Sequence, residues 1–194
     1  MYGFNNCNDN NQKMAARNDE DILSLLRSSK TRDKGFSLLM DKYKERIYWH
    51  IRRIVVSHED AQDILQDTFI KVYRFCDSFV GNSQLYTWIY RIATNECIRM
   101  FHDRKIDFTS YDQVSEILID KLHEETTECE DTILVKFQEA VLRLPEKQKL
   151  VFNLRYYDEL SYEEIAGILD SSVGTLKTNY HYASEKIKEY MINN

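Results

Sequence analysis

The scarcity of residues that interrupt helices is the feature that most constrains how this chain folds. Its 194 residues include one proline, Pro145, and five glycines. Sheets joined by tight turns use both residues often, because glycine reaches positive φ angles and proline presets a turn. Few obligatory breaks favour helices over many short strands. The sequence therefore predicts an all-α protein, with room for two small domains.

Apolar residues recur at steps of three and four through the first half of the chain, which is the spacing of one helical face. Asn18 is expected to cap the first helix. Ser57, with an acid three residues later, is expected to cap another. A short helix is predicted over about residues 19–29, followed by three amphipathic helices that share one core, over about 36–54, 58–76 and 85–100.

The second half carries sharper start and stop signals. A helix is expected over about 130–142, and Pro145 suits the start of the next one, where a missing N–H costs nothing. Ser161 and Glu164 form a capping box that opens a short helix, and a turn at 170–172 separates it from a long final helix. A short capped helix, a tight turn and a longer helix form the helix-turn-helix pattern.

Acidic residues gather between these two halves. Residues 107–131 hold nine acids and one base, Lys121, for a local charge of -8, while the remainder has 25 bases and 23 acids, or +2. The helical period fades here, although the apolar run 116–119 suits a brief helical or docking segment. The predicted organisation is a flexible tail over 1–18, a first domain over 19–105, an acidic linker over 106–129 and a second domain over 130–194.

Several classes of protein are excluded by what the sequence lacks. No apolar run reaches the roughly 20 residues that cross a bilayer, and the polar N-terminus is unlike a signal peptide, so a cytoplasmic protein without membrane insertion is expected. The four cysteines form no Cys-x-x-Cys pair and the five histidines show no metal-binding spacing, so no metal is expected. Without a glycine-rich phosphate loop or a nucleophile elbow, we expect no enzyme, cofactor or small-molecule substrate.

The outer face of the final helix offers short polar groups and cations near its N-terminal end, where bases and phosphates lie when such a helix enters the major groove. A helical hairpin that never contacts DNA is the alternative. The candidate DNA-binding residues are Ser172, Thr175, Lys177, Thr178, His181, Tyr182 and Lys186.

The second half resembles region four of extracytoplasmic-function (ECF) sigma factors, in the sigma-70 family. The resemblance is carried by residues 142–148 (LRLPEKQ), 156–166 and 172–178 (SVGTLKT). It implies that this domain reads the minus-thirty-five promoter element and docks on the flap of the polymerase β subunit. Asn179 and Tyr182 stand where the family commonly has basic residues, which implies fewer phosphate contacts.

Residues 60–70 (DAQDILQDTFI) resemble the segment of region two that binds the clamp helices of the polymerase β′ subunit. The resemblance implies polymerase contacts for Asp63, Gln66 and Asp67. Without it, the same residues would be read as the solvated face of an amphipathic helix.

Residues 87–95 (TWIYRIATN) resemble the region-two helix that engages the minus-ten element. By helical count, Thr87, Arg91 and Thr94 face away from the core, whereas Trp88 points inward. An aromatic and cationic surface of this kind can hold a melted strand. The candidate minus-ten residues are Asn82, Thr87, Tyr90, Arg91, Thr94, Asn95, Arg99, Arg104 and Lys105.

The resemblance as a whole implies an alternative sigma factor that binds core RNA polymerase, recognises promoter DNA and helps to melt it. It also implies an anti-sigma partner. The acidic linker is then either a polyanionic strand that occupies the nucleic-acid cleft of the polymerase or a solvated tether. Two other readings are an autonomous helix-turn-helix regulator and a helical interaction protein that does not bind DNA.

Overall fold

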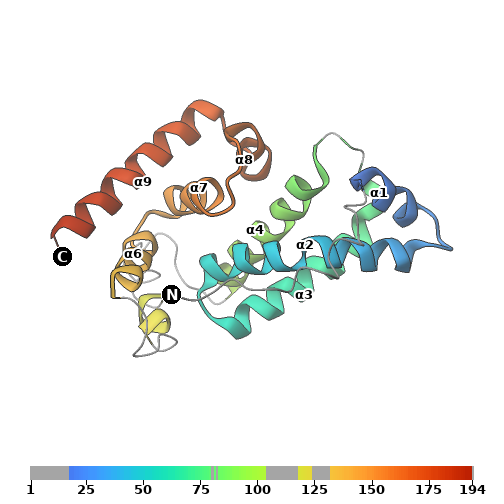
Figure 1. The fold of residues 1–194 in the computed structure, drawn as a ribbon, viewed down its shortest axis with the longest axis horizontal. Helices are drawn as coiled ribbons and strands as arrows, with labels where there is room; N and C mark the ends of the chain where they lie inside the picture. The colour runs from blue at the N-terminus through green and yellow to red at the C-terminus, as the bar shows by residue number, and fades with distance from the viewer. Residues whose placement is uncertain (1–17, 80, 82, 104–117, 124–131, 194) are drawn as a thin grey trace, which may run out of the picture.

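The computed structural model describes residues 18–79, 81, 83–103, 118–123 and 132–193. These residues form helices joined by turns, without a strand among them, in agreement with the predicted all-α class (Figure 1). Four α-helices and a short 3-10 helix make up the N-terminal bundle: α1 (Asp19–Arg27), α2 (Arg32–Val55), α3 (His58–Phe75), η1 (Cys76–Ser78) and α4 (Leu85–Asp103). Four more make up the C-terminal bundle: α6 (Thr132–Leu142), α7 (Glu146–Tyr156), α8 (Tyr162–Leu169) and α9 (Val173–Asn193).

The N-terminal bundle is held by apolar side chains of α2, α3 and α4. Ile47, Ile51, Val72 and Ala93 are all fully buried, which agrees with the predicted common core. The first two helices also meet closely at Gly35. A Cβ there would lie 2.8 Å from the backbone nitrogen of Leu26, so only glycine allows this approach.

The predicted helix caps of this bundle are confirmed in one case and not in the other. Ser57 Oγ accepts a hydrogen bond from the backbone N–H of Asp60 at 3.3 Å, which begins α3 as predicted. The Asn18 side chain makes no capping bond. Its backbone carbonyl instead accepts from the N–H of Asp21 at 2.9 Å.

The helix-turn-helix of the C-terminal bundle is set by local hydrogen bonds. Ser161 and Glu164 form the full capping box at the start of α8. Asp170 ends that helix in the left-handed conformation, with φ of 50°. Ser172 Oγ then accepts from the backbone N–H of Thr175 at 3.1 Å, so α9 starts after a turn of three residues, as predicted.

One part of the predicted acidic linker is described, and it is docked on the N-terminal bundle. Residues 118–123 are helical, and Leu118, Ile119 and Leu122 are buried. Lys121 Nζ donates to Asp60 Oδ2 at 2.9 Å. The brief helix predicted near 116–119 overlaps this described helix at residues 118 and 119, while most of the acidic residues lie outside the described ones.

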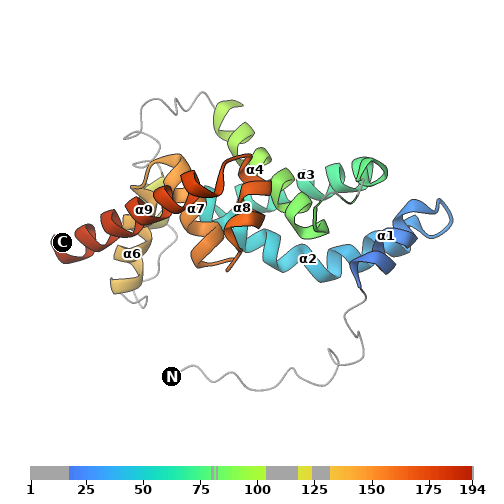
Figure 2. The same cartoon turned by 90° about the horizontal axis from the view of Figure 1, so that it is seen from above.

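The two bundles pack against each other. A single cluster of buried apolar side chains runs from Ile51 and Ile89 of the N-terminal bundle to Leu154, Ile165 and Leu176 of the C-terminal bundle. Figures 1 and 2 show α8 beside α4 and α7 beside α2, with α9 extending away. The sequence pattern did not predict this contact, because each helix stripe looks the same whether its partner is near or far along the chain.

Within the described ranges, no helix combines the length and apolar character needed to cross a membrane.

Candidate functional site

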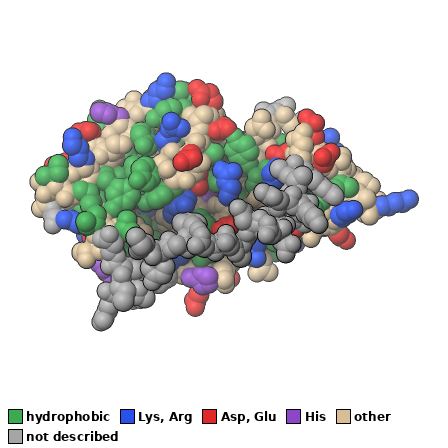
Figure 3. Space-filling view, viewed as in Figure 1, with side chains coloured by type: hydrophobic (Ala, Val, Ile, Leu, Met, Phe, Trp, Pro, Cys, Tyr) green, Lys and Arg blue, Asp and Glu red, His purple; other side chains and the backbone are tan. Residues whose placement is uncertain are grey.

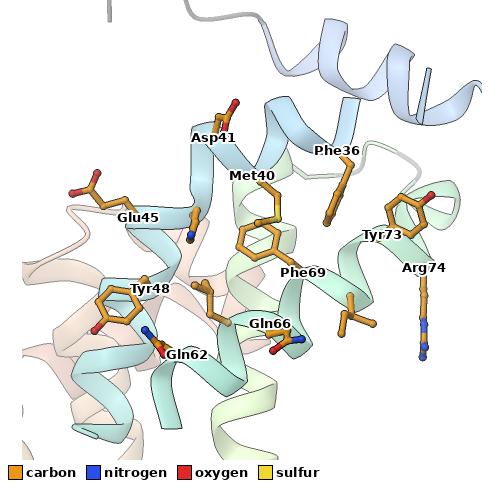
Figure 4. A pocket seen from close by; sticks show the side chains of 13 residues that line it. Phe36, Met40, Asp41, Glu45, Tyr48, Gln62, Gln66, Phe69, Tyr73 and Arg74 are labelled. Carbon is orange, nitrogen blue, oxygen red and sulfur yellow. The ribbon is translucent and has the colours of Figure 1, made fainter. Parts of the chain in front are cut away.

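A groove of about 980 Å³ opens between α2 and α3 (Figure 4). Phe36 and Met40 from α2 and Phe69 from α3 form its apolar floor, and the exposed Ile70 lies at its edge. The polar residues around this floor are Asp41, Lys44, Glu45, Gln62, Gln66 and Arg74. We call this feature the α2–α3 groove. An apolar floor with polar edges is the shape that accepts one face of an amphipathic helix.

The three residues predicted to bind polymerase lie along the exposed side of α3, but only one of them lines the groove. Gln66 is part of the wall. Asp63 and Asp67 are exposed on the outer side of the helix, and Asp67 Oδ2 lies 3.1 Å from Arg99 of α4. The sequence analysis did not predict the groove, because Phe36 and Met40 follow the same three- and four-residue spacing as the core residues of this helix. Both remain partly exposed.

The predicted minus-ten residues of α4 are largely covered. We call Thr87, Tyr90, Arg91, Thr94 and Asn95 the α4 face. Three of them, Thr87, Tyr90 and Thr94, have exposed fractions of 4%, 0% and 1%. Thr87 and Thr94, which were predicted to face away from the core, are therefore buried in this arrangement.

The physical reason is that other helices occupy the space next to α4. A Cβ added at Gly167 of α8 would lie 3.2 Å from Thr87 Cγ2, so the two helices touch there. Tyr90 OH donates to Asp158 Oδ1 at 3.3 Å, and Thr94 Oγ1 is hydrogen-bonded to His50 Nε2 at 2.9 Å. Trp88 packs on the core beside Phe79, as predicted.

The exposed residues of the α4 face lie near the start of α9. Arg91 and Asn95 line a cavity of about 610 Å³ together with Thr175 and Asn179. Arg91 Nη2 lies 3.8 Å from Asp170 Oδ1, in the turn between α8 and α9. The two surfaces predicted to contact DNA thus border the same cavity. Three further predicted residues, Asn82, Arg104 and Lys105, lie outside the described ones.

Arg99 differs from the expected phosphate-binding cation because carboxylates surround it. Its guanidinium lies 2.6 Å from Glu96, 3.1 Å from Asp67 and 3.8 Å from Asp103. Glu96 is 4% exposed and also pairs with Lys71. A buried carboxylate needs such partners, because desolvation disfavours its charged form. Arg99 therefore has a structural role whether or not it meets DNA.

All seven candidate residues, Ser172 just before α9 and six within it, are exposed, while Leu176, Ala183 and Ile187 form the buried side of the helix. We call the seven the α9 face. Two of its hydroxyl groups serve the helix itself: Ser172 caps the first turn, and Thr178 Oγ1 donates to the carbonyl of Gly174 at 3.1 Å. Lys177 Nζ lies 5.7 Å from the centre of the Tyr162 ring. Lys177, His181, Tyr182 and Lys186 extend outward from this face.

An aromatic surface covers part of the C-terminal bundle. Phe152 stacks on Tyr156 at 5.1 Å and on Tyr180 at 5.7 Å between ring centres, and Phe137 lies 5.7 Å from Tyr156. Tyr156 is 52% exposed and Leu134 is 60% exposed. Figure 3 shows hydrophobic side chains gathered over this half of the molecule. The sequence analysis assigned no binding role to this aromatic surface, and the available signal was the density of these residues.

Comparison with known proteins agrees with both halves of the structure. Residues 39–106 match the family model of Sigma-70 region 2, and residues 134–187 match that of Sigma-70, region 4. The chain is 34% identical over 166 residues to the ECF RNA polymerase sigma factor SigW of Bacillus subtilis, covering 81% of this chain and 89% of that protein. It is 35% identical over 170 residues to the ECF RNA polymerase sigma-E factor of Salmonella typhimurium, covering 83% and 88%.

A solved structure has the same fold. The sigma factor RpoE of Bartonella quintana, crystallised in complex with the anti-sigma factor NepR, superposes with a TM-score of 0.64 at 22% identity. The match covers 81% of this chain and 97% of that one.

Proposed function

This chain belongs to the sigma-70 family and is an alternative sigma factor of the ECF type, and we propose which of its surfaces bind RNA polymerase and which bind promoter DNA. Sigma factors bind core polymerase and promoter DNA and act in transcription initiation. We assign residues 19–105 to region two, 106–129 to the linker and 130–194 to region four. In this proposal the polymerase carries out the chemistry of transcription, and this chain contributes no catalytic group.

Polymerase binding is assigned first to α3 and the α2–α3 groove. Asp63, Gln66 and Asp67 present carboxylate and amide oxygens to solvent along one helix, beside an apolar floor. A helical segment of the β′ clamp would place apolar side chains on Phe69 and neighbouring residues, and the polar edge would fix its register. Apolar contact then supplies most of the affinity and the polar groups supply orientation.

A second polymerase contact is assigned to the aromatic surface of the C-terminal bundle. Exposed apolar groups such as Leu134 and Tyr156 favour burial against a partner, because large apolar patches are uncommon on monomers. The flap of the β subunit is the partner that the region-four assignment implies. Two separate contacts on one partner would raise the total affinity through effective concentration.

Promoter recognition is assigned to the α9 face for the minus-thirty-five element and to the α4 face for the minus-ten element. The observation that carries this proposal is the exposure of all seven predicted residues, Ser172 just before α9 and six along it, on the second helix of a helix-turn-helix. Lys177 and Lys186 supply the charge for phosphate contacts, and Thr175 supplies a short polar group near the start of the helix.

An anti-sigma partner is also proposed. The fold neighbour RpoE was crystallised with its anti-sigma factor NepR, and a chain that carries an open apolar groove is suited to a helical inhibitor. Such an inhibitor would compete with core polymerase, so adding core enzyme in excess should release it in a pull-down assay.

The experiment that tests the function is transcription in vitro. Core polymerase with this protein should start transcripts from a genomic DNA library, whereas core polymerase alone should not. A gel-shift experiment with the selected fragments then separates a sigma factor from an autonomous regulator. A regulator would bind duplex DNA tightly without polymerase. Dependence of DNA binding on core polymerase supports the sigma assignment, and its absence contradicts it.

A further inference from the structure

We propose that a cavity between α2, α6 and α7 binds a nucleotide, with the base on Asn153 and the phosphate on Arg52 and Arg53. The cavity measures about 640 Å³, within the range of about 300–1,000 Å³ that is typical of small-molecule sites. We call it the Asn153 cavity. The residues of its wall that matter here are Trp49, Arg52, Arg53, Gln138, Asn153 and Tyr157. None of these six belongs to the surfaces assigned above to polymerase or promoter DNA.

The observation that points to a ligand is the side chain of Asn153. This residue of α7 is fully buried, and neither its amide nitrogen nor its amide oxygen has a hydrogen-bond partner within the described part of the chain. A buried amide without partners costs free energy, because the water that it loses is not replaced. Two such atoms in the wall of a cavity therefore call for a bound molecule that supplies both a donor and an acceptor.

This pair of atoms restricts the chemistry of the bound molecule. A carboxylate or a phosphate offers acceptors alone and would leave the Asn153 oxygen unpaired, whereas an ammonium group would leave the nitrogen unpaired. The edge of a nucleobase carries a donor next to an acceptor, as adenine does with N6 and N7, and asparagine pairs with both at once. Gln138 brings a second amide to the same cavity. A nucleobase therefore satisfies both atoms of Asn153.

The charged groups of the cavity favour an anion. Arg52, Arg53 and His58 are among the described residues that line it, and no aspartate or glutamate is, although the whole chain has 32 acids against 26 bases. Arg53 also pairs with Asp158 at 3.1 Å, but through one nitrogen, and a guanidinium has further N–H groups to donate. Guanidinium groups bind phosphate bidentately. The cavity thus combines phosphate-binding groups from α2 with a base-binding group from α7.

Aromatic and apolar side chains supply the remaining contact. Trp49 is 49% exposed, whereas Val141 and Leu142 are buried parts of the wall. Burial raises the pKa of Tyr157 to about 12, so its hydroxyl stays neutral and does not repel a phosphate. Stacking of bases on aromatic rings tolerates every base, because each has a flat π-face. The cavity is therefore suited to nucleotides as a class, and its amides decide which base binds best.

The proposed nucleotide is a ligand that this chain holds without transforming it. Because the wall includes residues of both bundles, a bound nucleotide contacts both at once. A ligand that binds only the folded protein stabilises it by mass action. The melting temperature of the free protein should therefore rise with nucleotide concentration. This inference is independent of the assigned polymerase and promoter contacts, since it concerns the protein alone.

Isothermal titration calorimetry of the full chain tests the inference. The probes are AMP, GMP, CMP and UMP, with adenosine and inorganic phosphate as the separate halves of a nucleotide. We expect at least one nucleotide to bind with a Kd below about 1 mM, and each half to bind at least about tenfold more weakly than AMP. Absence of binding by all four nucleotides would overturn the proposal. Phosphate binding as tight as that of the nucleotides would contradict the role of Asn153.

Two variants test the individual contacts. Asn153→Leu should weaken nucleotide binding at least about tenfold and raise the melting temperature of the free protein, because it removes two buried atoms that lack partners. Arg52→Gln should weaken nucleotide binding but leave the binding of adenosine unchanged. Lys34→Gln removes a charge at an exposed position near the other end of α2. It is the matched control and should alter none of these quantities.

The outcomes separate a ligand site from a structural role. Nucleotide affinity equal to that of the parent in Asn153→Leu would overturn the proposal. If Asn153→Leu instead lowers the melting temperature or fails to fold, Arg52→Gln decides, because Arg52 is partly exposed. Unchanged nucleotide binding in Arg52→Gln would then overturn the proposal, and selective loss of phosphate-dependent affinity would support it.

Discussion

The imidazole Nδ1 of His50 lies 3.1 Å from Oδ2 of Asp158, although 108 positions separate the two residues in the chain. His50 belongs to α2 and Asp158 to the turn after α7, so this contact joins the two bundles. The buried cluster around it is continuous with apolar packing on both sides. Cooperative unfolding is expected when such packing spans both units.

The first prediction concerns this cooperativity. The parent protein should unfold in one calorimetric transition, because the two bundles share buried surface. Asp158→Ala should split the transition in two or broaden it, since removal of the carboxylate leaves His50 and Arg53 without that partner. Differential scanning calorimetry measures this. Glu163→Ala, an exposed substitution on α8, should keep the single transition, and a single unshifted transition in Asp158→Ala would argue against coupling through this site.

The second prediction concerns the polymerase surface. Asp63→Arg with Asp67→Arg should abolish co-purification with the β′ subunit, because both carboxylates are exposed on the helix assigned to that contact. Exposed charge reversals usually change stability little, so the circular dichroism spectrum should stay the same. Glu20→Arg, on α1, is a control that reverses a distant exposed acid. Retention of β′ by the double variant would remove α3 from the interface.

The third prediction concerns the α9 face. Lys177→Ala should weaken promoter binding by the polymerase complex. It should also reduce the salt slope, which is the steepness with which the logarithm of affinity falls with the logarithm of salt concentration, by about 0.9, the value for one lost phosphate contact. Lys188→Ala removes the same charge about 16 Å further along the helix and should leave the slope near that of the parent. Thr178→Ala should weaken binding without changing the slope, because threonine carries no charge. A titration of binding against salt concentration distinguishes these outcomes.

The fourth prediction concerns Lys149, which is 5% exposed in α7. Burial lowers its pKa from the ordinary 10.5 to about 8. Between these values the unfolded chain holds a proton that the folded chain lacks, so the free energy of unfolding should rise with pH from about 8 to 10.5. Below pH 8 the buried charge is fully present and destabilising.

Lys149→Met should therefore stabilise the protein at pH 7, by roughly 1–3 kcal/mol, and should remove this rise with pH. Lys147→Met, at an exposed position of the same helix, should do neither. Urea unfolding at pH 7, 8 and 9.5 measures both effects. Parallel curves for Lys149→Met and the parent would show that Lys149 is charged at all of these pH values.

The fifth prediction concerns the acidic linker. Replacing the nine acids of residues 107–131 with Asn and Gln should strengthen DNA binding by the free protein, because this segment carries -8 against +2 in the rest of the chain. The gain should be largest at low salt, where screening is weakest. Fluorescence anisotropy with a promoter duplex at low and high salt measures it. An unchanged affinity at low salt would indicate that the linker serves only as a tether between the two domains.

Local features of the sequence determined the elements of this protein. The helix periods, the cap at Ser57 and the capping box of Ser161 with Glu164 depend on residues within one or two turns, so their outcome could be predicted without the rest of the chain. The exposed α9 face follows from the same periodicity, because Leu176, Ala183 and Ile187 leave only one side for its polar groups. Two motif sets also indicated the sigma family.

Tertiary structure decided what these elements contact. The α4 face has the polarity of an exposed surface, and only the position of α8 explains why Thr87 and Thr94 are buried. Likewise, nothing near His50 or Asp158 in the sequence marks them as partners. The α2–α3 groove is lined by residues of two helices, and the periodicity of each helix alone does not show which side chains stay partly exposed between them. Contacts between distant segments depend on how whole helices pack, which a periodic pattern of single residues does not encode.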